Sequence, residues 1–212
     1  MRLLLRNPLC RRRRRMSDIL YRYGGSLYVN MTNRCPNKCT FCVRSCSDGL
    51  GSADSLWLDR EPTMDELYRE FHKWNMNDFA EVVFCGYGEP TERFADMMKL
   101  AEHIHWKYGK RVRLNTNGLG CLINGRDIVP EMKGKIDAVS ISLNAPNAER
   151  YHEVCRSRFG LDAYPAILDF IRACRETIPS VTVSVVSGSI TQAEEDECGR
   201  IANELRVAYR VR

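Results

Sequence analysis

Four cysteines lie within twelve residues, in the segment CPNKCTFCVRSC at positions 35–46. Closely spaced thiols bind a metal or form disulfides, and the redox state of the compartment decides which is favoured. No apolar stretch long enough for an export signal follows the basic residues near the start. The other six cysteines are widely scattered, at positions 10, 85, 121, 155, 174 and 198. We therefore expect a cytoplasmic, reducing location in which this segment binds a metal.

Three kinds of metal site are compatible with these thiols. A structural zinc site needs four ligands, and four are present, but such sites usually combine two short pairs that lie far apart in sequence. A ferredoxin-type cluster normally uses Cx2Cx2C followed by Cys-Pro, and no such set occurs here. The third kind is a [4Fe–4S] cluster on three thiolates, which leaves one iron open to a ligand. The Cx3Cx2C spacing of Cys35, Cys39 and Cys42 has this pattern.

The thiols follow the first of several predicted strands. Residues 26–32, SLYVNMT, alternate apolar and polar side chains as a strand does, and lead directly into the cysteine segment. Further strands are expected at 81–85, 111–116, 138–143 and 181–186, and in VAYRV near the end.

Helices are expected between these strands. The sequences TMDE at 63–66 and TQAE at 191–194 have the form of a capping box, which marks a helix start. An amphipathic pattern over 94–104 predicts a helix stopped by Gly109, and the pattern over 167–178 predicts one that Pro179 terminates.

This alternation predicts an α/β fold, an open partial (βα)6 barrel with a parallel sheet. Six units are too few for a closed eight-fold barrel. In such folds, polar residues at the carboxyl ends of the strands converge on one face. The segments GYGEP (86–90), NTNG (115–118) and NAPN (144–147) each follow a predicted strand. We therefore expect them to share one rim with the cysteine segment.

Composition indicates one globular domain. The chain has 212 residues, 44% hydrophobic and 28% charged, and no apolar run long enough to cross a bilayer. Residues 1–15 carry seven Arg and no acidic residue, so the net charge of +5 becomes −2 for the remainder. We expect 1–15 to be a basic, disordered tail and 16–212 to be the domain. Residues 16–212 are nearly neutral, so their net charge does not predict a general attraction to nucleic acid. Nucleic acid is nevertheless not excluded as a partner.

Three segments carry a resemblance to a known family. NRCPNKCTFC (33–42) resembles the radical S-adenosylmethionine (radical SAM) signature, with Phe41 at the aromatic position. GYGEP resembles the Gly-Gly-Glu-Pro element of that family, with Tyr87 where a second glycine often stands. SLNAPNAERYHEVCR (142–156) is similar to the small radical SAM family associated with TatD-type nucleases. The resemblance runs from about Tyr21 to the end and implies a radical SAM enzyme of the partial-barrel type.

The resemblance implies two cofactors, a [4Fe–4S] cluster and S-adenosylmethionine (SAM). Cys35, Cys39 and Cys42 would hold the cluster, and the amino and carboxylate groups of SAM would chelate its open iron. An electron then cleaves SAM to methionine and a 5′-deoxyadenosyl radical, which removes a hydrogen atom from the substrate. A fourth thiolate would occupy the open iron, so Cys46 is not expected to be a ligand.

The resemblance also implies contacts with SAM. Glu89 and the carbonyls of Gly86 and Gly88 would accept hydrogen bonds from the amino group, because glycine permits close backbone approach. Neutral polar groups suit the ribose hydroxyls and an aromatic ring suits adenine, and the residues expected there are Asn115, Ser142, Asn144 and Phe41. The simpler interpretation is that GYGEP and the two asparagines only form turns.

The expected partners are a reductant such as flavodoxin or ferredoxin and an unknown substrate, and the resemblance adds a TatD-type nuclease. Two alternative enzymes resemble this chain, a glycyl-radical activase and a carboxy-deazaguanine synthase. A non-catalytic zinc-binding module is the alternative from another class. Brown protein with about four iron and four sulfide per chain would indicate the enzyme. Colourless protein with about one zinc would indicate the module.

Overall fold

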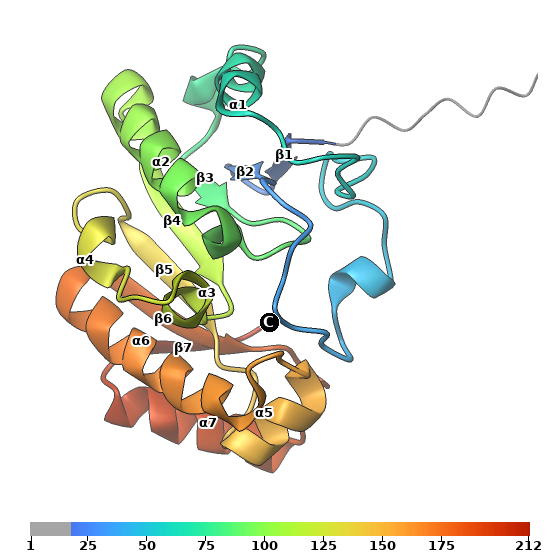
Figure 1. Cartoon of the computed structure of the whole chain (residues 1–212), viewed down its shortest axis with the longest axis vertical. Coiled ribbons are helices and arrows are strands. Elements are labelled where there is room, and N and C mark those ends of the chain that lie inside the picture. The colour runs from blue at the N-terminus through green and yellow to red at the C-terminus, as the bar shows by residue number, and fades with distance from the viewer. Residues whose placement is uncertain (1–17) are drawn as a thin grey trace, which may run out of the picture.

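The sheet has seven strands that follow one another in sequence order (Figure 1). The structure is a computed structural model that describes residues 18–212, so the expected basic tail, residues 1–15, lies outside the described residues. The strand β1 pairs antiparallel with β2, and all later neighbours pair in parallel. The strands are β1 (Leu20–Tyr23), β2 (Ser26–Val29), β3 (Glu81–Phe84), β4 (Arg111–Thr116), β5 (Ala138–Ser142), β6 (Ser180–Val185) and β7 (Ala208–Val211).

The prediction of an open, parallel partial barrel is confirmed. The six strands expected from the sequence correspond to β2 through β7. Val29, Phe84 and Leu114 are neighbours in register across β2, β3 and β4, and all three are fully buried. Apolar side chains on adjacent parallel strands thus fix the register, because a slip by one residue would turn them to the opposite face.

The strand β1 was not predicted. It forms a hairpin with β2 through the turn at Gly24 and Gly25, and Tyr21 lies opposite Tyr28. The sequence does contain a pattern that predicts this hairpin. The dipeptide Gly-Gly between LYRY and SLYV is typical of a tight two-residue turn between antiparallel strands. The hairpin adds an antiparallel edge strand to the six parallel ones.

Seven α-helices and four short 3-10 helices connect the strands within the described residues. The α-helices are α1 (Met64–Phe71), α2 (Phe94–Tyr108), α3 (Gly120–Asn124), α4 (Val129–Met132), α5 (Ala148–Cys155), α6 (Ala163–Thr177) and α7 (Gln192–Glu204). The 3-10 helices are η1 (Val43–Ser45), η2 (Met76–Asp78), η3 (Pro90–Arg93) and η4 (Gly160–Asp162).

The signals that predicted helix ends are confirmed. Thr63 and Thr191 cap α1 and α7, each in a complete capping box. The helix α2 ends at Gly109, and Pro179 follows the end of α6. The helices α3, α4 and α5 were not predicted. The first two have only five and four residues, too few to display a clear apolar period. The helix α5 is as long as α1 but has no capping box at its start, and its N-cap Asn147 belongs to the segment NAPN.

The main core lies between the sheet and its helices. Figure 1 shows the helices on the outer side of the curved sheet, while the segment between β2 and α1 crosses the open side and reaches down to α5. The carboxyl ends of the strands therefore face this segment. Within residues 18–212, no helix has the length and apolar character needed to cross a membrane.

Candidate functional site

One cavity of about 370 Å³ lies at the carboxyl ends of the strands. It brings together every residue that the sequence analysis assigned to the site. These are Cys35, Cys39, Phe41, Cys42, Gly86, Gly88, Glu89, Asn115, Ser142 and Asn144. Their roles as ligands stay predictions. By contrast, Cys46 is exposed at the end of η1 and does not line this cavity.

The cysteine segment is held in place by the end of α5. The backbone N–H groups of Lys38 and Thr40 donate to the carbonyls of Cys155 and Val154, at 3.0 and 2.9 Å. Carbonyls in the last turn of a helix have no partner within it and need donors from elsewhere. The segment supplies these donors, so the helix end and the thiol-bearing segment stabilise each other.

The thiols of Cys35 and Cys39 are partly buried. Burial, followed by the nearby Glu89 carboxyl, raises the pKa of Cys35 to about 12. A hydrogen bond with the Cys155 thiol, followed by burial, raises the pKa of Cys39 well above its ordinary value. The Arg44 side chain acts in the opposite direction on the pKa of both thiols. A bound cation is the group that would most favour their thiolate forms.

The thiols do not converge on one point. Among residues 18–212, no group of three or more His, Cys, Asp or Glu side chains is arranged to hold a single metal ion. A tetrahedral zinc site needs all its sulfurs within about 2.3 Å of one ion. In an iron–sulfur cluster the thiolates bind different iron atoms. Three thiols that line one cavity without meeting at a single point are compatible with thiolates that bind different iron atoms.

Glu89 is a buried carboxylate with four hydrogen-bond donors around it. Oε1 accepts from the Thr91 N–H at 3.2 Å and from the Thr91 and Thr116 hydroxyls, both at 2.8 Å. Oε2 accepts from the Asn117 N–H at 2.8 Å. Burial raises the pKa of Glu89, and these hydrogen bonds act against that rise. Glu89 thus joins the ends of β3 and β4, and no cation pairs with it among the described residues.

Gly86 and Gly88 are required by the protein's own packing. A Cβ at Gly86 would lie 2.1 Å from Asn30 Oδ1, and one at Gly88 would lie 2.2 Å from the Thr32 carbonyl. Both glycines were expected to allow SAM to come close to the backbone. In the structure, the segment that follows β2 packs closely against both glycines, at Asn30 and Thr32. Both glycines also line the cavity.

The polar residues at the ends of β4 and β5 carry unused hydrogen-bonding atoms. Asn115 Oδ1 and Asn144 Oδ1 are buried and have no partner. Asn144 also has a positive φ of 59° and sits in a tight turn, as its simpler interpretation expected. The turn leaves Asn144 in the cavity wall, and its contact with the SAM ribose stays a prediction. The Ser142 hydroxyl accepts from Arg212 Nη2 at 3.0 Å.

Tyr87, which stands where the family often has glycine, points away from this cavity. It is buried in a small cluster with Tyr21 and Leu56. Its hydroxyl donates to the Ser47 carbonyl, which belongs to the chain just beyond the cysteine segment. The tyrosine thus ties the two segments together without occupying the space over Glu89.

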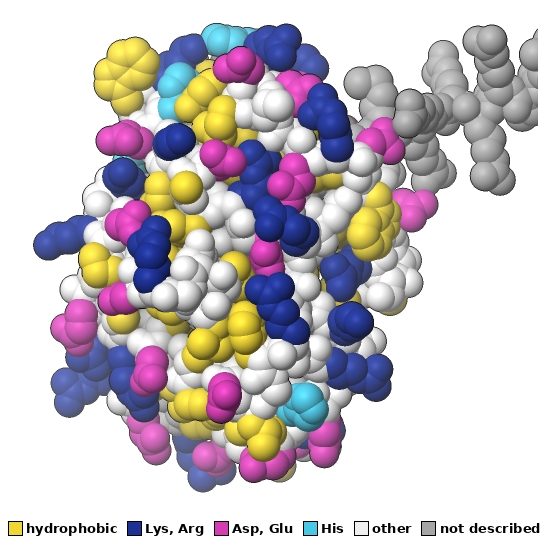
Figure 2. All heavy atoms as spheres, in the orientation of Figure 1, with side chains coloured by type: hydrophobic (Ala, Val, Ile, Leu, Met, Phe, Trp, Pro, Cys, Tyr) yellow, Lys and Arg dark blue, Asp and Glu magenta, His cyan; other side chains and the backbone are white. Residues whose placement is uncertain are grey.

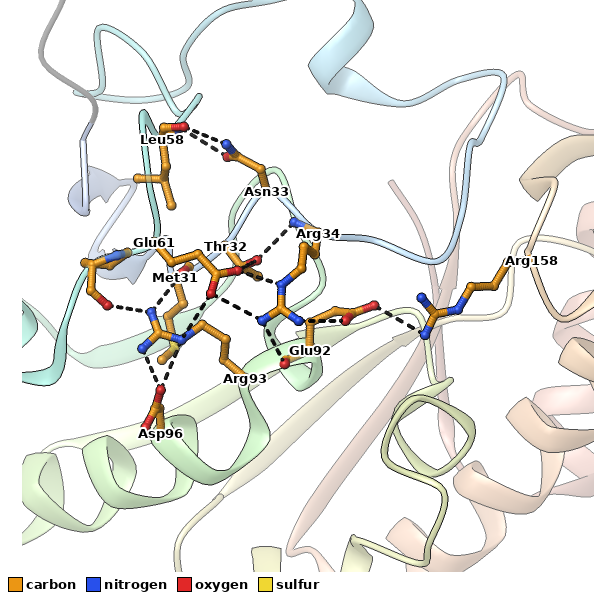
Figure 3. A network of polar contacts seen from close by, with 11 residues as sticks. Met31, Thr32, Asn33, Arg34, Leu58, Glu61, Glu92, Arg93, Asp96 and Arg158 are labelled. Atoms are coloured by element: carbon orange, nitrogen blue, oxygen red, sulfur yellow. Dashed lines mark hydrogen bonds and ion pairs between the residues drawn. The ribbon is translucent and has the colours of Figure 1, made fainter.

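A polar network fixes the start of the cysteine segment (Figure 3). Arg34 pairs with Glu61 at 2.7 Å and with Glu92 at 3.4 Å, and Arg158 approaches Glu92 at 3.7 Å from beyond α5. The Arg34 carbonyl accepts from the backbone N–H of Glu89 at 2.8 Å. The network therefore connects the cysteine segment to GYGEP and to the start of α2.

We expect Arg93→Met to lower the free energy of unfolding by about 2–4 kcal/mol. The Arg93 side chain is only 9% exposed, donates to the carbonyls of Met31 and Pro62 at 3.2 and 2.6 Å, and pairs with Asp96. Its removal leaves two carbonyls and a carboxylate without their donor. Urea denaturation measures the change.

The matched control is Arg172→Met on α6. That side chain is 58% exposed and pairs with Asp169 one turn away. An exposed pair of this kind contributes less than about 1 kcal/mol. Equal losses in the two variants would contradict a structural role for the network.

Comparison with known proteins assigns the chain to a family. Its sequence matches the Radical SAM superfamily over residues 29–198. The chain belongs to the radical SAM superfamily. The radical SAM match begins at the end of β2 and extends into α7, so it includes all three predicted cluster ligands and every residue that lines the cavity except Arg212. The prediction of an enzyme family is confirmed at this level.

The relatives of this radical SAM chain have different activities. It is 26% identical to a probable dual-specificity RNA methyltransferase RlmN of Caldanaerobacter subterraneus subsp. tengcongensis over 168 residues, covering 74% of this chain and 43% of the relative. It is 31% identical to GTP 3′,8-cyclase of Corynebacterium glutamicum over 146 residues, covering 66% of this chain and 36% of the relative. The chain thus spans about two fifths of the length of these curated relatives.

A solved structure shares the fold of the radical SAM chain. Streptococcus suis SuiB bound to its precursor peptide SuiA matches with a TM-score of 0.66 at 16% identity, over 88% of this chain and 38% of that chain. This likeness supports the partial barrel.

The cofactors of the superfamily are a [4Fe–4S] cluster and SAM, as the sequence analysis expected. The residues of this radical SAM chain fit both. Three thiols line one cavity. The same cavity contains a buried carboxylate that has no cationic partner, and two buried amide oxygens that have no donor, within the described part of the chain. SAM carries an ammonium group, a sulfonium and two ribose hydroxyls, which would satisfy these groups.

Other polar residues of the cavity wall were missed, namely Asn37, Thr116, Asn117 and Arg212. Asn37 donates to the Tyr151 hydroxyl at 2.8 Å, and Asn117 Nδ2 lies 3.9 Å from Cys35 Sγ. Arg212 holds Ser142. Asn37 lies in the cysteine segment and Asn117 lies in NTNG, so their positions in the sequence could have indicated that they line the site. No local pattern in the sequence connects Arg212 with β5.

Proposed function

We propose that this chain is a radical SAM enzyme in which Cys35, Cys39 and Cys42 hold a [4Fe–4S] cluster and the adjoining strand ends hold SAM. The observation that carries the proposal is the single cavity in which three thiols lie beside the buried carboxylate of Glu89, which has no cationic partner among residues 18–212. When bound and reduced, these cofactors supply a 5′-deoxyadenosyl radical that removes a hydrogen atom from the substrate.

The chain's own residues would bind and orient SAM. Glu89 would attract the ammonium group, because a buried carboxylate is stabilised by a nearby positive charge. Asn115 and Asn144 would accept hydrogen bonds from the ribose hydroxyls through their unpartnered oxygens. Phe41 is half-buried in the cavity wall, where its ring suits contact with adenine. The carbonyls of Gly86 and Gly88 stay the predicted acceptors for the amino group.

The proposal includes an external electron donor of the flavodoxin or ferredoxin type and an association with a TatD-type nuclease. It includes no general attraction to nucleic acid. On the face drawn in Figure 2, basic and acidic side chains are interspersed, and the described residues form no continuous basic area there. A specific nucleic-acid substrate would have to be recognised at the cavity itself.

Cluster-loaded protein is expected to cleave SAM without added substrate. After anaerobic reconstitution the protein should be brown, with about four iron and four sulfide per chain. Reduced with dithionite, it should slowly release 5′-deoxyadenosine and methionine, measured by liquid chromatography. A fully loaded cluster that yields no 5′-deoxyadenosine with any reductant would refute the proposed function, and a colourless protein with about one zinc would favour the binding module.

A further inference from the structure

A second cavity, of about 600 Å³, opens beside the first on the inner side of the sheet. The two share Val43, Cys85, Gly86, Asn115 and Arg212 as wall residues. A molecule in the second cavity would therefore lie next to SAM in the first. Its volume is in the range of small-molecule sites.

Three guanidinium groups face this second cavity, from Arg113, Arg210 and Arg212, and no Asp or Glu lines it. Arg113 is partly neutralised by Glu81 at 2.8 Å, yet its Nε is buried without a partner. Within residues 18–212, Arg210 and Arg212 have no acidic partner at ion-pair distance. Arg210 and Arg212 are both exposed to solvent, and partial desolvation followed by repulsion from Arg210 lowers the pKa of Arg212.

Like charges are gathered here at an energetic cost that an anion would relieve. Guanidinium groups bind phosphate and carboxylate oxygens in pairs of parallel hydrogen bonds. A single carboxylate would neutralise only one of the two guanidinium groups without an acidic partner. A phosphate group, or a chain of them, supplies the charge that matches the cluster.

Three tyrosines also line this cavity. Tyr21 is buried, whereas Tyr28 is half-buried with its hydroxyl 3.5 Å from Arg113 and Tyr23 is exposed. The ring centroids of Tyr21 and Tyr28 lie 5.2 Å apart, and those of Tyr23 and Tyr28 lie 5.7 Å apart. Tyr23 lines the cavity and is 54% exposed, so much of its ring is open to solvent. Exposed aromatic rings next to cations are a surface on which planar bases stack.

We infer that the second cavity binds a phosphate-bearing nucleotide, with its phosphates on Arg113, Arg210 and Arg212 and its base against the rings of Tyr23 and Tyr28. The inference rests on the proposed function, because it names the substrate class of the same enzyme. A free nucleotide and a nucleotide within RNA present the same chemistry. The experiment separates these two sources.

Calorimetric titrations of the anaerobic, cluster-loaded protein with saturating SAM and no reductant test the inference. The probes are GTP, ATP, guanosine and a short single-stranded RNA. A nucleoside triphosphate or the RNA is expected to bind with a Kd below about 1 mM, at least tenfold tighter than guanosine. Binding of GTP or ATP identifies a free nucleotide, and binding of the RNA alone identifies a nucleotide within RNA.

Arg113→Gln and Arg210→Gln are each expected to raise the Kd of the bound probe at least about tenfold. Arg172→Gln on α6 removes the same charge outside the cavity and is expected to change the Kd less than twofold. Arg113 also pairs with Glu81 and contacts Tyr28, so the exposed Arg210 provides the variant that is safe for folding.

The inference is overturned if no phosphate-bearing probe binds below about 1 mM, or if the cavity variants bind as the Arg172 control does. The same preparations are assayed for 5′-deoxyadenosine. Wild-type protein that cleaves SAM but binds no probe refutes only this inference. Loaded protein that does not cleave SAM refutes the proposed function, whether or not a nucleotide binds.

Discussion

Replacing Cys35, Cys39 or Cys42 singly by alanine is expected to abolish SAM cleavage and to leave the cluster labile or absent. Cys46→Ala is expected to retain both the brown colour and the 5′-deoxyadenosine product. The first three thiols line the cavity beside Glu89, whereas Cys46 is exposed outside it. The cluster needs three thiolates if one iron is to remain open for SAM. Iron and sulfide analysis and the product assay measure the two effects.

The Cys46 variant is the internal control of this series, because it removes a thiol from the same segment. Loss of metal from Cys46→Ala as complete as from the other three would mean that all four thiols are ligands. That result would favour the alternative interpretation, a closed site in which all four thiols bind zinc. It would also require the exposed end of η1 to fold back towards the cavity.

Glu89→Gln is expected to raise the Kd of SAM roughly ten- to a hundredfold while the cluster still assembles. The substitution removes the buried negative charge that would face the ammonium group. It also leaves an amide nitrogen to replace one of the carboxylate oxygens that accept from Thr91, Thr116 and Asn117. Anaerobic calorimetry with SAM measures the affinity, and metal analysis confirms cluster content.

Thr91→Val is the matched control for Glu89. The Thr91 hydroxyl donates to Glu89 Oε1 at 2.8 Å, but Thr91 does not line the cavity. Its loss should cost about 1 kcal/mol of stability and leave the SAM affinity within about threefold of the wild type. If Glu89→Gln binds SAM as well as this control does, Glu89 serves only to join the ends of β3 and β4.

Much of the fold could be predicted because its signals are local. The alternation of residues 26–32, the capping boxes at Thr63 and Thr191, and the stops at Gly109 and Pro179 each depend on a few neighbouring residues. Local patterns are weakest for very short elements, which explains why α3 and α4 were missed, whereas α5 lacks the capping box that marked α1. The hairpin strand β1 was missed although its Gly-Gly turn was visible in the sequence.

The amino-acid sequence alone was enough to predict the radical SAM family and the order of the six parallel strands. The spacing of Cys35, Cys39 and Cys42, and polar segments at successive strand ends, were enough to predict one rim, since parallel strands bring their carboxyl ends together. The contacts around the thiols and the polar strand ends became visible in the three-dimensional structure alone. It gave Glu89 four donors, packed Gly86 against Asn30, and collected three arginines in a second cavity. These contacts join residues distant in sequence, so they depend on strand register and side-chain packing, which no local pattern encodes.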